Sequence, residues 1–163
     1  FNEGLNMREK MVLFWHDHFA CERDKVNYPQ HMYQQNQLFR KFAFGNIKQL
    51  VKEVCVDPTM LIYLDGNNSR GTGANENFAR ELFELFSLGI GNYTENDIRQ
   101  AAKVLAGWQV KGLSAAFDPT RWHKDTSVTI FGKTASELVV EKAINKGLLI
   151  RCNNTNKRFP KMI

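Results

Sequence analysis

Residues 75–108, "NENFARELFELFSLGIGNYTENDIRQAAKVLAGW", decide the fold class because they carry the signals of two consecutive helices. The first helix is expected over about residues 76–88, since Asn75 can cap its amino end and Gly89 can end it. Its phenylalanines and leucines recur with the helical period, so one face is expected to be buried in a core. The stretch therefore predicts a mainly α-helical protein.

The second helix of this stretch is expected to begin at Thr94. Thr94 and Asp97 have the spacing of a capping box, in which each side chain accepts a hydrogen bond from the other residue's backbone N–H. Gly107 is expected to end the helix. Four residues form the stripe that should face the core: Ile98, Ala101, Ala102 and Leu105.

The acidic residues of the first helix raise the question of whether it carries a site. On a helical wheel, one side holds the apolar residues Phe78, Ala79, Leu82, Phe83, Leu85 and Phe86. The other side holds the polar residues Glu76, Asn77, Arg80, Glu81 and Glu84. Glu76, Arg80 and Glu84 are also spaced for an i, i+4 ladder of ion pairs. The simplest interpretation is a polar face exposed to solvent.

A functional interpretation of the same face stays open. If Glu81, together with Asn77 or Glu84, points into a cleft, the carboxylates can bind a divalent cation or act as acid and base. The spacing permits this arrangement without requiring it.

The sequence "WHDHF", residues 15–19, holds two histidines. On a β-strand, His16 and His18 would share a face and could bind one metal ion, but on a helix they lie about 200° apart. The flanking sequence favours a helix over residues 6–20, in which His16 faces outward. His18 falls on an apolar stripe with Met7, Met11, Phe14 and Trp15. Such a histidine is most often a hydrogen-bonded core residue, and the alternative is a ligand or base that reaches a carboxylate of residues 76–84.

The rest of the chain predicts further short helices. They are expected over residues 33–44, after the cap residue Asn46, and after Asp57 and Pro58, which suit an N-cap and the first helical position. Residues 108–132 are β-prone and predict a small hairpin or an irregular excursion.

These signals together predict an irregular multi-helix bundle with a small β excursion. A last amphipathic segment is expected over about residues 136–146. We expect a single helical domain over residues 1–150 and a basic polar tail over residues 151–163.

Positive charge is concentrated at the carboxyl end. The net charge of the chain is +5, but residues 151–163 hold four basic residues and no acidic residue, so residues 1–150 carry only +1. A nucleic-acid-binding domain is expected to show a basic face on its folded part, and this distribution argues against nucleic-acid binding. No apolar run approaches the roughly 20 residues of a membrane helix, so no transmembrane segment is expected.

Two motifs, N-E-N-F-A-R-E-L at 75–82 and L-G-x-G-x-Y-T-E-x-D at 88–97, resemble the bacterial family called domain of unknown function 1800. Similar segments include "REKMVLFWHDHFA", "NQLFRKFAFGN", "DPTMLIYLDGNNSRG" and "FDPTRWHKDTSVTIFGKT". The resemblance covers about residues 5–134 and implies a mostly helical part of a longer, often exported protein, with no established reaction. The matching polar positions are His16, His18, Asn75, Glu76, Asn77, Arg80, Glu81, Glu84 and His123.

After about residue 134 the sequence departs from that resemblance. A truncated or frame-shifted product would explain both the departure and the basic tail. The first residue is Phe1, which suggests that the chain is part of a longer protein.

Two classes of function remain after these observations. We favour a non-catalytic binding or scaffold domain of an exported or periplasmic protein, with a protein partner, because the sequence shows no complete catalytic motif. The alternative is a metal-dependent hydrolase, in which His18 and Glu81 hold a divalent metal and Glu84 is a further catalytic carboxylate.

Overall fold

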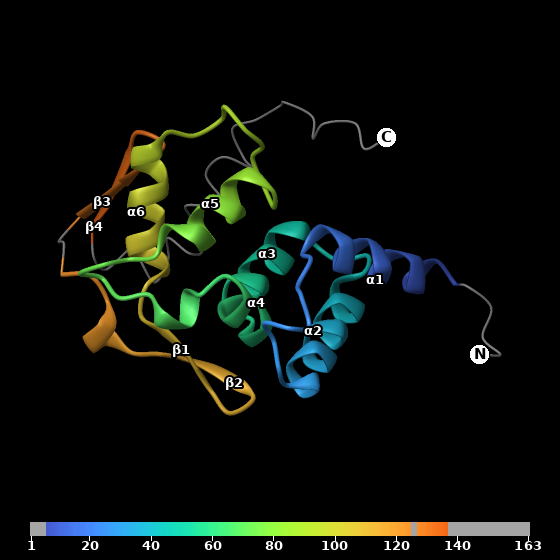
Figure 1. Cartoon of the computed structure of the whole chain (residues 1–163). Coiled ribbons are helices and arrows are strands. Elements are labelled where there is room, and N and C mark those ends of the chain that lie inside the picture. The colour runs from blue at the N-terminus through green and yellow to red at the C-terminus, as the bar shows by residue number, and fades with distance from the viewer. Residues whose placement is uncertain (1–5, 125–126, 137–163) are drawn as a thin grey trace.

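The computed structural model describes residues 6–124 and 127–136. Within these residues the chain forms six α-helices and two antiparallel strand pairs (Figure 1). The helices are α1 (Met7–His18), α2 (Pro29–Phe42), α3 (Ile47–Cys55), α4 (Pro58–Tyr63), α5 (Glu76–Glu84) and α6 (Glu95–Leu105). The strands are β1 (Trp108–Lys111), β2 (Ser114–Phe117), β3 (Ser127–Ile130) and β4 (Lys133–Ser136), and short 3-10 turns cover Gly66–Asn68 and Pro119–Arg121. The mainly helical fold is confirmed, whereas a bundle is not.

Local sequence signals fix where four of these helices begin. Asn46 caps α3, Asp57 caps α4 and Asn75 caps α5, each by accepting hydrogen bonds from backbone N–H groups of the first turn. Thr94 and Asp97 form the predicted capping box at the start of α6.

One hydrophobic core cluster includes residues from all six helices. The buried ring of Phe19, which follows α1, stacks on Phe39 of α2 with ring centroids 5.8 Å apart. The same ring lies 5.2 Å from Phe86, which follows α5. Phe19 therefore holds the carboxyl end of α1 against both α2 and the segment after α5.

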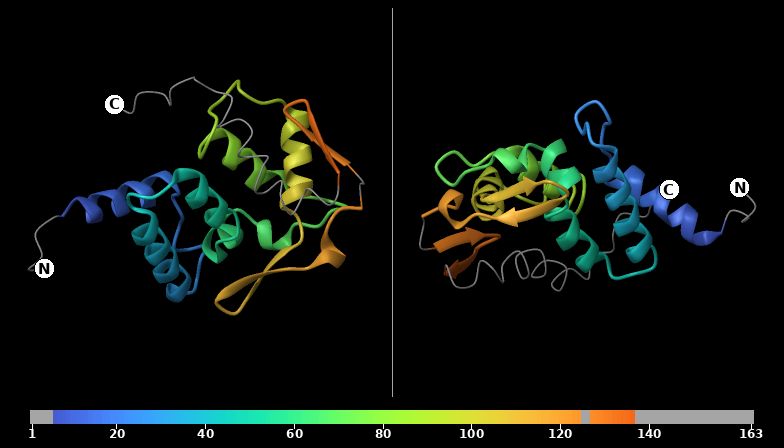
Figure 2. Two further views of the ribbon diagram at one scale, coloured as in Figure 1. Left: turned by 180° about the vertical axis from the view of Figure 1, so that it is seen from behind. Right: turned by 90° about the horizontal axis from the view of Figure 1, so that it is seen from below.

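The second half of the fold is built on the α5–α6 pair. Ala101 and Ala102 are buried in α6, as the sequence predicts. The β3–β4 hairpin lies beside α6, at the end of the molecule opposite α1 (Figures 1 and 2). The β1–β2 hairpin directly follows α6, and Gly107 between them has the left-handed φ of +96°.

The β region differs from the single excursion expected near residues 108–132. It holds two hairpins, and the second continues to Ser136. The amphipathic segment expected over about residues 136–146 lies outside the described residues apart from Ser136, which ends β4. The tail over residues 151–163 also lies outside them.

The buried face of α1 also differs from the predicted stripe. Met7 is 63% exposed, whereas Val12 and Phe19 are buried. His16, which was expected to face outward, lies against α2, where its ring is 4.8 Å from that of Phe39. Because α1 packs mainly on α2, the buried face follows the position of that neighbour.

Two helix boundaries were also predicted wrongly. α2 begins at Pro29, before the predicted residue 33, and α5 ends at Glu84, before the predicted residue 88. Leu85, the first residue after α5, is 61% exposed although it was placed on the buried side, whereas Phe86 is buried as predicted. Of the described helices, none combines the length and apolar character needed to cross a membrane.

Candidate functional site

A cleft of about 470 Å³ opens where the carboxyl ends of α1 and α4 meet α5. Segments far apart in the sequence build it, including the loop between α1 and α2. The residues that line it are Asp17, His18, Ala20, Glu22, Lys25, Tyr63, Leu64, Asn77, Glu81, Leu85 and Phe86. Three polar residues that the sequence singled out, His18, Asn77 and Glu81, are therefore brought to one place.

His18 lies at the end of α1 with its ring among aromatic neighbours. The ring is 4.6 Å from that of Phe19, and it stacks on Phe14 at 6.1 Å. Its Nε2 atom is 3.2 Å from the backbone oxygen of Phe86. A carbonyl oxygen only accepts hydrogen bonds, so Nε2 carries the proton, and Nδ1 of the neutral ring is an acceptor.

Asn77 and Glu81 lie one turn apart on α5. The Asn77 Nδ2 atom donates to the backbone oxygen of Leu64 at 3.4 Å, which leaves the amide oxygen as an acceptor. The half-buried side chain of Glu81 makes no hydrogen bond or ion pair with any other described residue. Glu81 therefore presents an unpaired carboxylate to the cleft.

The charge of the cleft is mainly negative. Asp17 and Glu22 are exposed carboxylates on its lining. Lys25 is the cation of the described lining, but its Nζ atom is 2.8 Å from Asp65 Oδ2, and it lies 5.8 Å from the centre of the Tyr63 ring. This pairing neutralises Lys25 and leaves the carboxylates of the cleft in excess.

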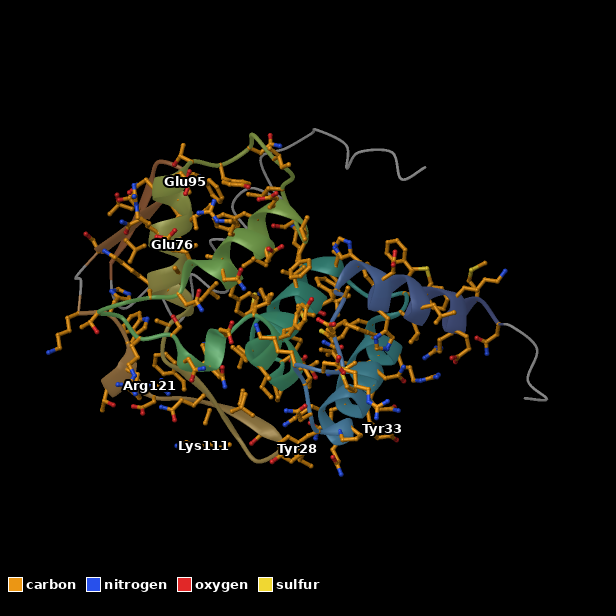
Figure 3. All side chains as sticks on the ribbon, in the orientation of Figure 1. Tyr28, Tyr33, Glu76, Glu95, Lys111 and Arg121 are labelled. Carbon is orange, nitrogen blue, oxygen red and sulfur yellow. The ribbon has the colours of Figure 1, made fainter. Side chains whose placement is uncertain are left out.

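The other acidic residues of α5 face α6 instead of the cleft. Arg80 binds both carboxylate oxygens of Glu95 at 2.8 Å and Glu76 at 3.4 Å. Figure 3 shows Glu76 and Glu95 on the side of the molecule away from α1. The predicted ladder is thus only half formed, because Arg80 pairs with Glu95 and not with Glu84.

Glu84, a predicted catalytic candidate, is also turned toward α6. Its carboxylate accepts a hydrogen bond of 2.9 Å from the hydroxyl of Tyr93. Two causes raise the pKa of Tyr93: burial is the larger, and this hydrogen bond to a carboxylate is the second. Glu84 does not line the cleft.

The remaining predicted positions are not brought to the cleft. Asn75 is the cap of α5, and His16 Nε2 is 3.0 Å from Asn36 Nδ2 between α1 and α2. His123 is buried beside Trp122, with ring centroids 4.2 Å apart. The fold therefore separates these three residues from His18, Asn77 and Glu81, although all of them match the family motifs.

Several lining residues were missed by the sequence analysis. Glu22 and Lys25 lie in an irregular loop with no helical period, and Leu85 was assigned to the core. Asp17 stands between the two histidines of "WHDHF", and its place in that motif was the one signal that could have found it.

The described residues can also be compared with the arrangement that a bound metal ion needs. Over residues 6–124 and 127–136, no group of three or more histidine, cysteine, aspartate or glutamate residues is placed to hold a metal ion. His18 and Glu81 line the same cleft, and they are the two metal ligands that the sequence suggested.

The family of the chain is shown by a family model. The model described as "Protein of unknown function (DUF1800)" matches residues 2–156. The chain belongs to this family. The DUF1800 match continues to residue 156, so it also covers residues after 134, where a departure was predicted. No curated protein and no solved structure matches the chain.

Proposed function

We propose that this DUF1800 chain is a non-catalytic binding domain whose ligand site is the cleft between α1, α4 and α5. The observation that carries the proposal is that His18, Asn77 and Glu81 line one cleft, although α1 and α5 lie far apart in the sequence. A concave site with a few convergent polar groups on apolar walls is typical of a ligand site.

The unpaired Glu81 carboxylate supports this proposal. A carboxylate that loses part of its hydration needs a partner, and in most proteins such groups find one within the fold. Glu76 and Glu84, on the same helix, have found partners on other elements, whereas Glu81 has none among the described residues. A bound ligand would supply the missing partner.

The chemistry of the lining supports binding over catalysis. No serine, threonine or cysteine stands among the described residues that line the cleft. His18 donates its Nε2 proton to a backbone carbonyl and keeps Nδ1 as an acceptor, but no hydroxyl or thiol nucleophile stands beside it among these lining residues. A nucleophile activated by a neighbouring base would need a different arrangement.

The proposal is tested by a ligand screen on the ¹⁵N-labelled full chain, using a set of small molecules balanced among cationic, anionic and neutral groups. We expect ligands whose largest amide shift changes fall on the cleft, at Asp17, Glu81 and Leu85. A screen whose ligands all map to other surfaces, or which yields none, would refute the proposal.

A metal-dependent hydrolase is the second candidate, because His18 and Glu81 line the same cleft as that hypothesis requires. Elemental analysis of the untagged protein, with His18→Ala and Glu81→Ala as variants, tests it. Stoichiometric zinc, manganese or iron that either substitution abolishes would favour the hydrolase. If the protein contains no metal and still binds a ligand in the cleft, the hydrolase is refuted and the proposed binding function stands.

We also propose, from the family resemblance, that the domain works in an exported bacterial protein. Fractionation of bacterial cells that make the full-length protein tests this. Finding the protein only in the cytoplasm would refute export without affecting the ligand site.

A further inference from the structure

Three side chains that line the cleft offer hydrogen-bond acceptors that no described residue uses. The Nε2 proton of His18 is used by Phe86, and one of the two amide N–H donors of Asn77 is used by Leu64. Nδ1 of neutral His18, Oδ1 of Asn77 and the carboxylate of Glu81 remain as acceptors, and none of these atoms can donate. A ligand that satisfies them must supply several N–H or O–H donors.

The charge of the lining selects among such donors. Asp17, Glu22 and Glu81 are negative, and Lys25 is already neutralised by Asp65 at 2.8 Å. An anionic ligand would be repelled, and a neutral donor would leave the carboxylates uncompensated. A cation that carries N–H donors fits both conditions.

The apolar walls of the cleft fit a cation on an aliphatic stem. Tyr63 and Phe86 present aromatic rings, and Leu85 is 61% exposed on the lining. The ammonium of Lys25 lies 5.8 Å from the centre of the Tyr63 ring, so this ring already contacts a cation of the chain itself.

The distribution of the acceptors favours a guanidinium group over an ammonium group. His18 belongs to α1, whereas Asn77 and Glu81 belong to α5, so the acceptors approach from two directions. A guanidinium spreads five N–H donors over a plane and stacks on aromatic rings, whereas an ammonium concentrates its donors at one point.

We infer that the cleft binds the guanidinium group of an arginine side chain presented by a partner protein. This inference rests on the proposed function of the cleft. A residue within a polypeptide fits better than the free amino acid, because the α-carboxylate of free arginine would face the carboxylates of the cleft.

The test measures dissociation constants by NMR titration of the ¹⁵N-labelled full chain. N-acetyl-arginine methylamide is the probe, because it represents an arginine residue within a chain. The matched probes are the corresponding lysine and citrulline derivatives and free L-arginine. Citrulline keeps the shape of arginine but has no positive charge. We expect shift changes at the cleft, and we expect the arginine probe to bind more tightly than the lysine probe. The citrulline probe should bind at least roughly tenfold more weakly than the arginine probe.

Two variants give the matched protein control. Glu81→Gln removes the unpaired carboxylate, and Glu53→Gln removes an exposed carboxylate of α3 that does not line the cleft. We expect Glu81→Gln to weaken binding of the arginine probe by roughly tenfold and Glu53→Gln to leave it within about twofold. The backbone spectra of both variants show directly whether the fold is retained.

Each contrary result has a distinct meaning. Equal binding of citrulline, or equal effects of the two variants, would overturn the guanidinium assignment. If free L-arginine binds more tightly than N-acetyl-arginine methylamide, the ligand is a small molecule and the inference of a partner protein is wrong. If arginine fails while other molecules of the screen bind in the cleft, the inference falls and the proposed function stands.

Discussion

At the scale of single residues, Gly71 lies where the loop after α4 closely approaches the segment after β2. Its N–H donates to the backbone oxygen of Arg121 at 2.8 Å, and a Cβ built on it would lie 2.2 Å from His123 Cα. Gly71→Ala must therefore shift the backbone, and we expect a loss of more than about 2 kcal/mol in the free energy of unfolding. Urea denaturation measures it. Gly73→Ala is the control, because a Cβ there meets nothing within 4 Å, and it should change stability by less than about 0.5 kcal/mol.

Asp57 gives a second prediction at this scale. Its buried carboxylate accepts hydrogen bonds from Met60 N–H at 3.1 Å and from Gln35 Nε2 at 3.0 Å. Burial nevertheless raises its pKa to about 6 from an ordinary value of 3.8. Between these two values the folded state holds more protons than the unfolded state, so stability falls as the pH rises.

Asp57→Asn removes this titration and keeps a good cap residue. As the pH rises from 4 to 7, we expect the free energy of unfolding of the variant to increase relative to that of the wild type by on the order of 3 kcal/mol. Urea denaturation of both proteins at several pH values measures the difference. A constant difference across that range would contradict the raised pKa.

At the scale of elements, α1 and α2 are joined by a polar contact whose proton positions are fixed. Arg40 forms a two-point ion pair with Glu9, and its Nε donates to Asn36 Oδ1 at 2.8 Å. The Asn36 amide is thereby oriented, so its N–H group faces His16 Nε2, which must accept. The contact between the two helices therefore requires a neutral His16.

The pH dependence of this contact follows from the His16 ring. Burial, with a smaller contribution from Arg40, lowers the pKa of His16 below its ordinary value of 6.5. The unfolded chain then takes up a proton first as the pH falls, so this part of the stability is present above pH 6.5 and decreases below it.

Asn36→Asp would place a carboxylate beside His16 and raise the pKa of that ring. We expect the variant to become more stable relative to the wild type as the pH falls from 7 to 5, as measured by urea denaturation. The His16 titration followed by NMR should show the raised pKa of the ring. Asn27→Asp adds the same charge at an exposed loop position and should leave the His16 titration unchanged. An unchanged titration in Asn36→Asp would show that the contact is not formed.

The capping box of α6 also connects two elements. Thr94 Oγ1 accepts from Asp97 N–H at 3.2 Å, while Asp97 Oδ1 accepts from the N–H of Phe131 in the β3–β4 turn. Thr94→Ala should cost about 1 kcal/mol of stability, and Asp97→Ala should cost more because it also releases the hairpin. Asn96→Ala, at an exposed position of the same helix, is the control in urea denaturation. Equal costs for the two cap variants would contradict the link to the hairpin.

At the scale of the whole molecule, the features that the sequence predicted are those with local causes. The caps at Asn46, Asp57 and Thr94 depend on residues within one turn of one another, and the structure has all three. The direction in which His16 faces depends on α2, which lies twenty residues further along the chain, and the prediction was wrong. Periodicity identifies a helix more reliably than it identifies which neighbour covers it.

The cleft illustrates the same limit. Asn77 and Glu81 were recognised as polar positions of one helix, and a cleft was one of two interpretations. They line one cleft with Lys25 and Tyr63 only because segments far apart in the sequence pack together. No spacing rule in a single sequence encodes that arrangement, whereas Glu84, one turn further along α5, is turned away toward Tyr93.

A crystal structure of the full chain soaked with N-acetyl-arginine methylamide would show directly whether the cleft binds a guanidinium group. We expect the guanidinium to lie between His18 of α1 and Glu81 of α5, with its N–H groups toward the carboxylate. The probe bound only elsewhere on the surface, with the side chain of Glu81 satisfied by another residue of the chain, would contradict the claim that this cleft is the binding site.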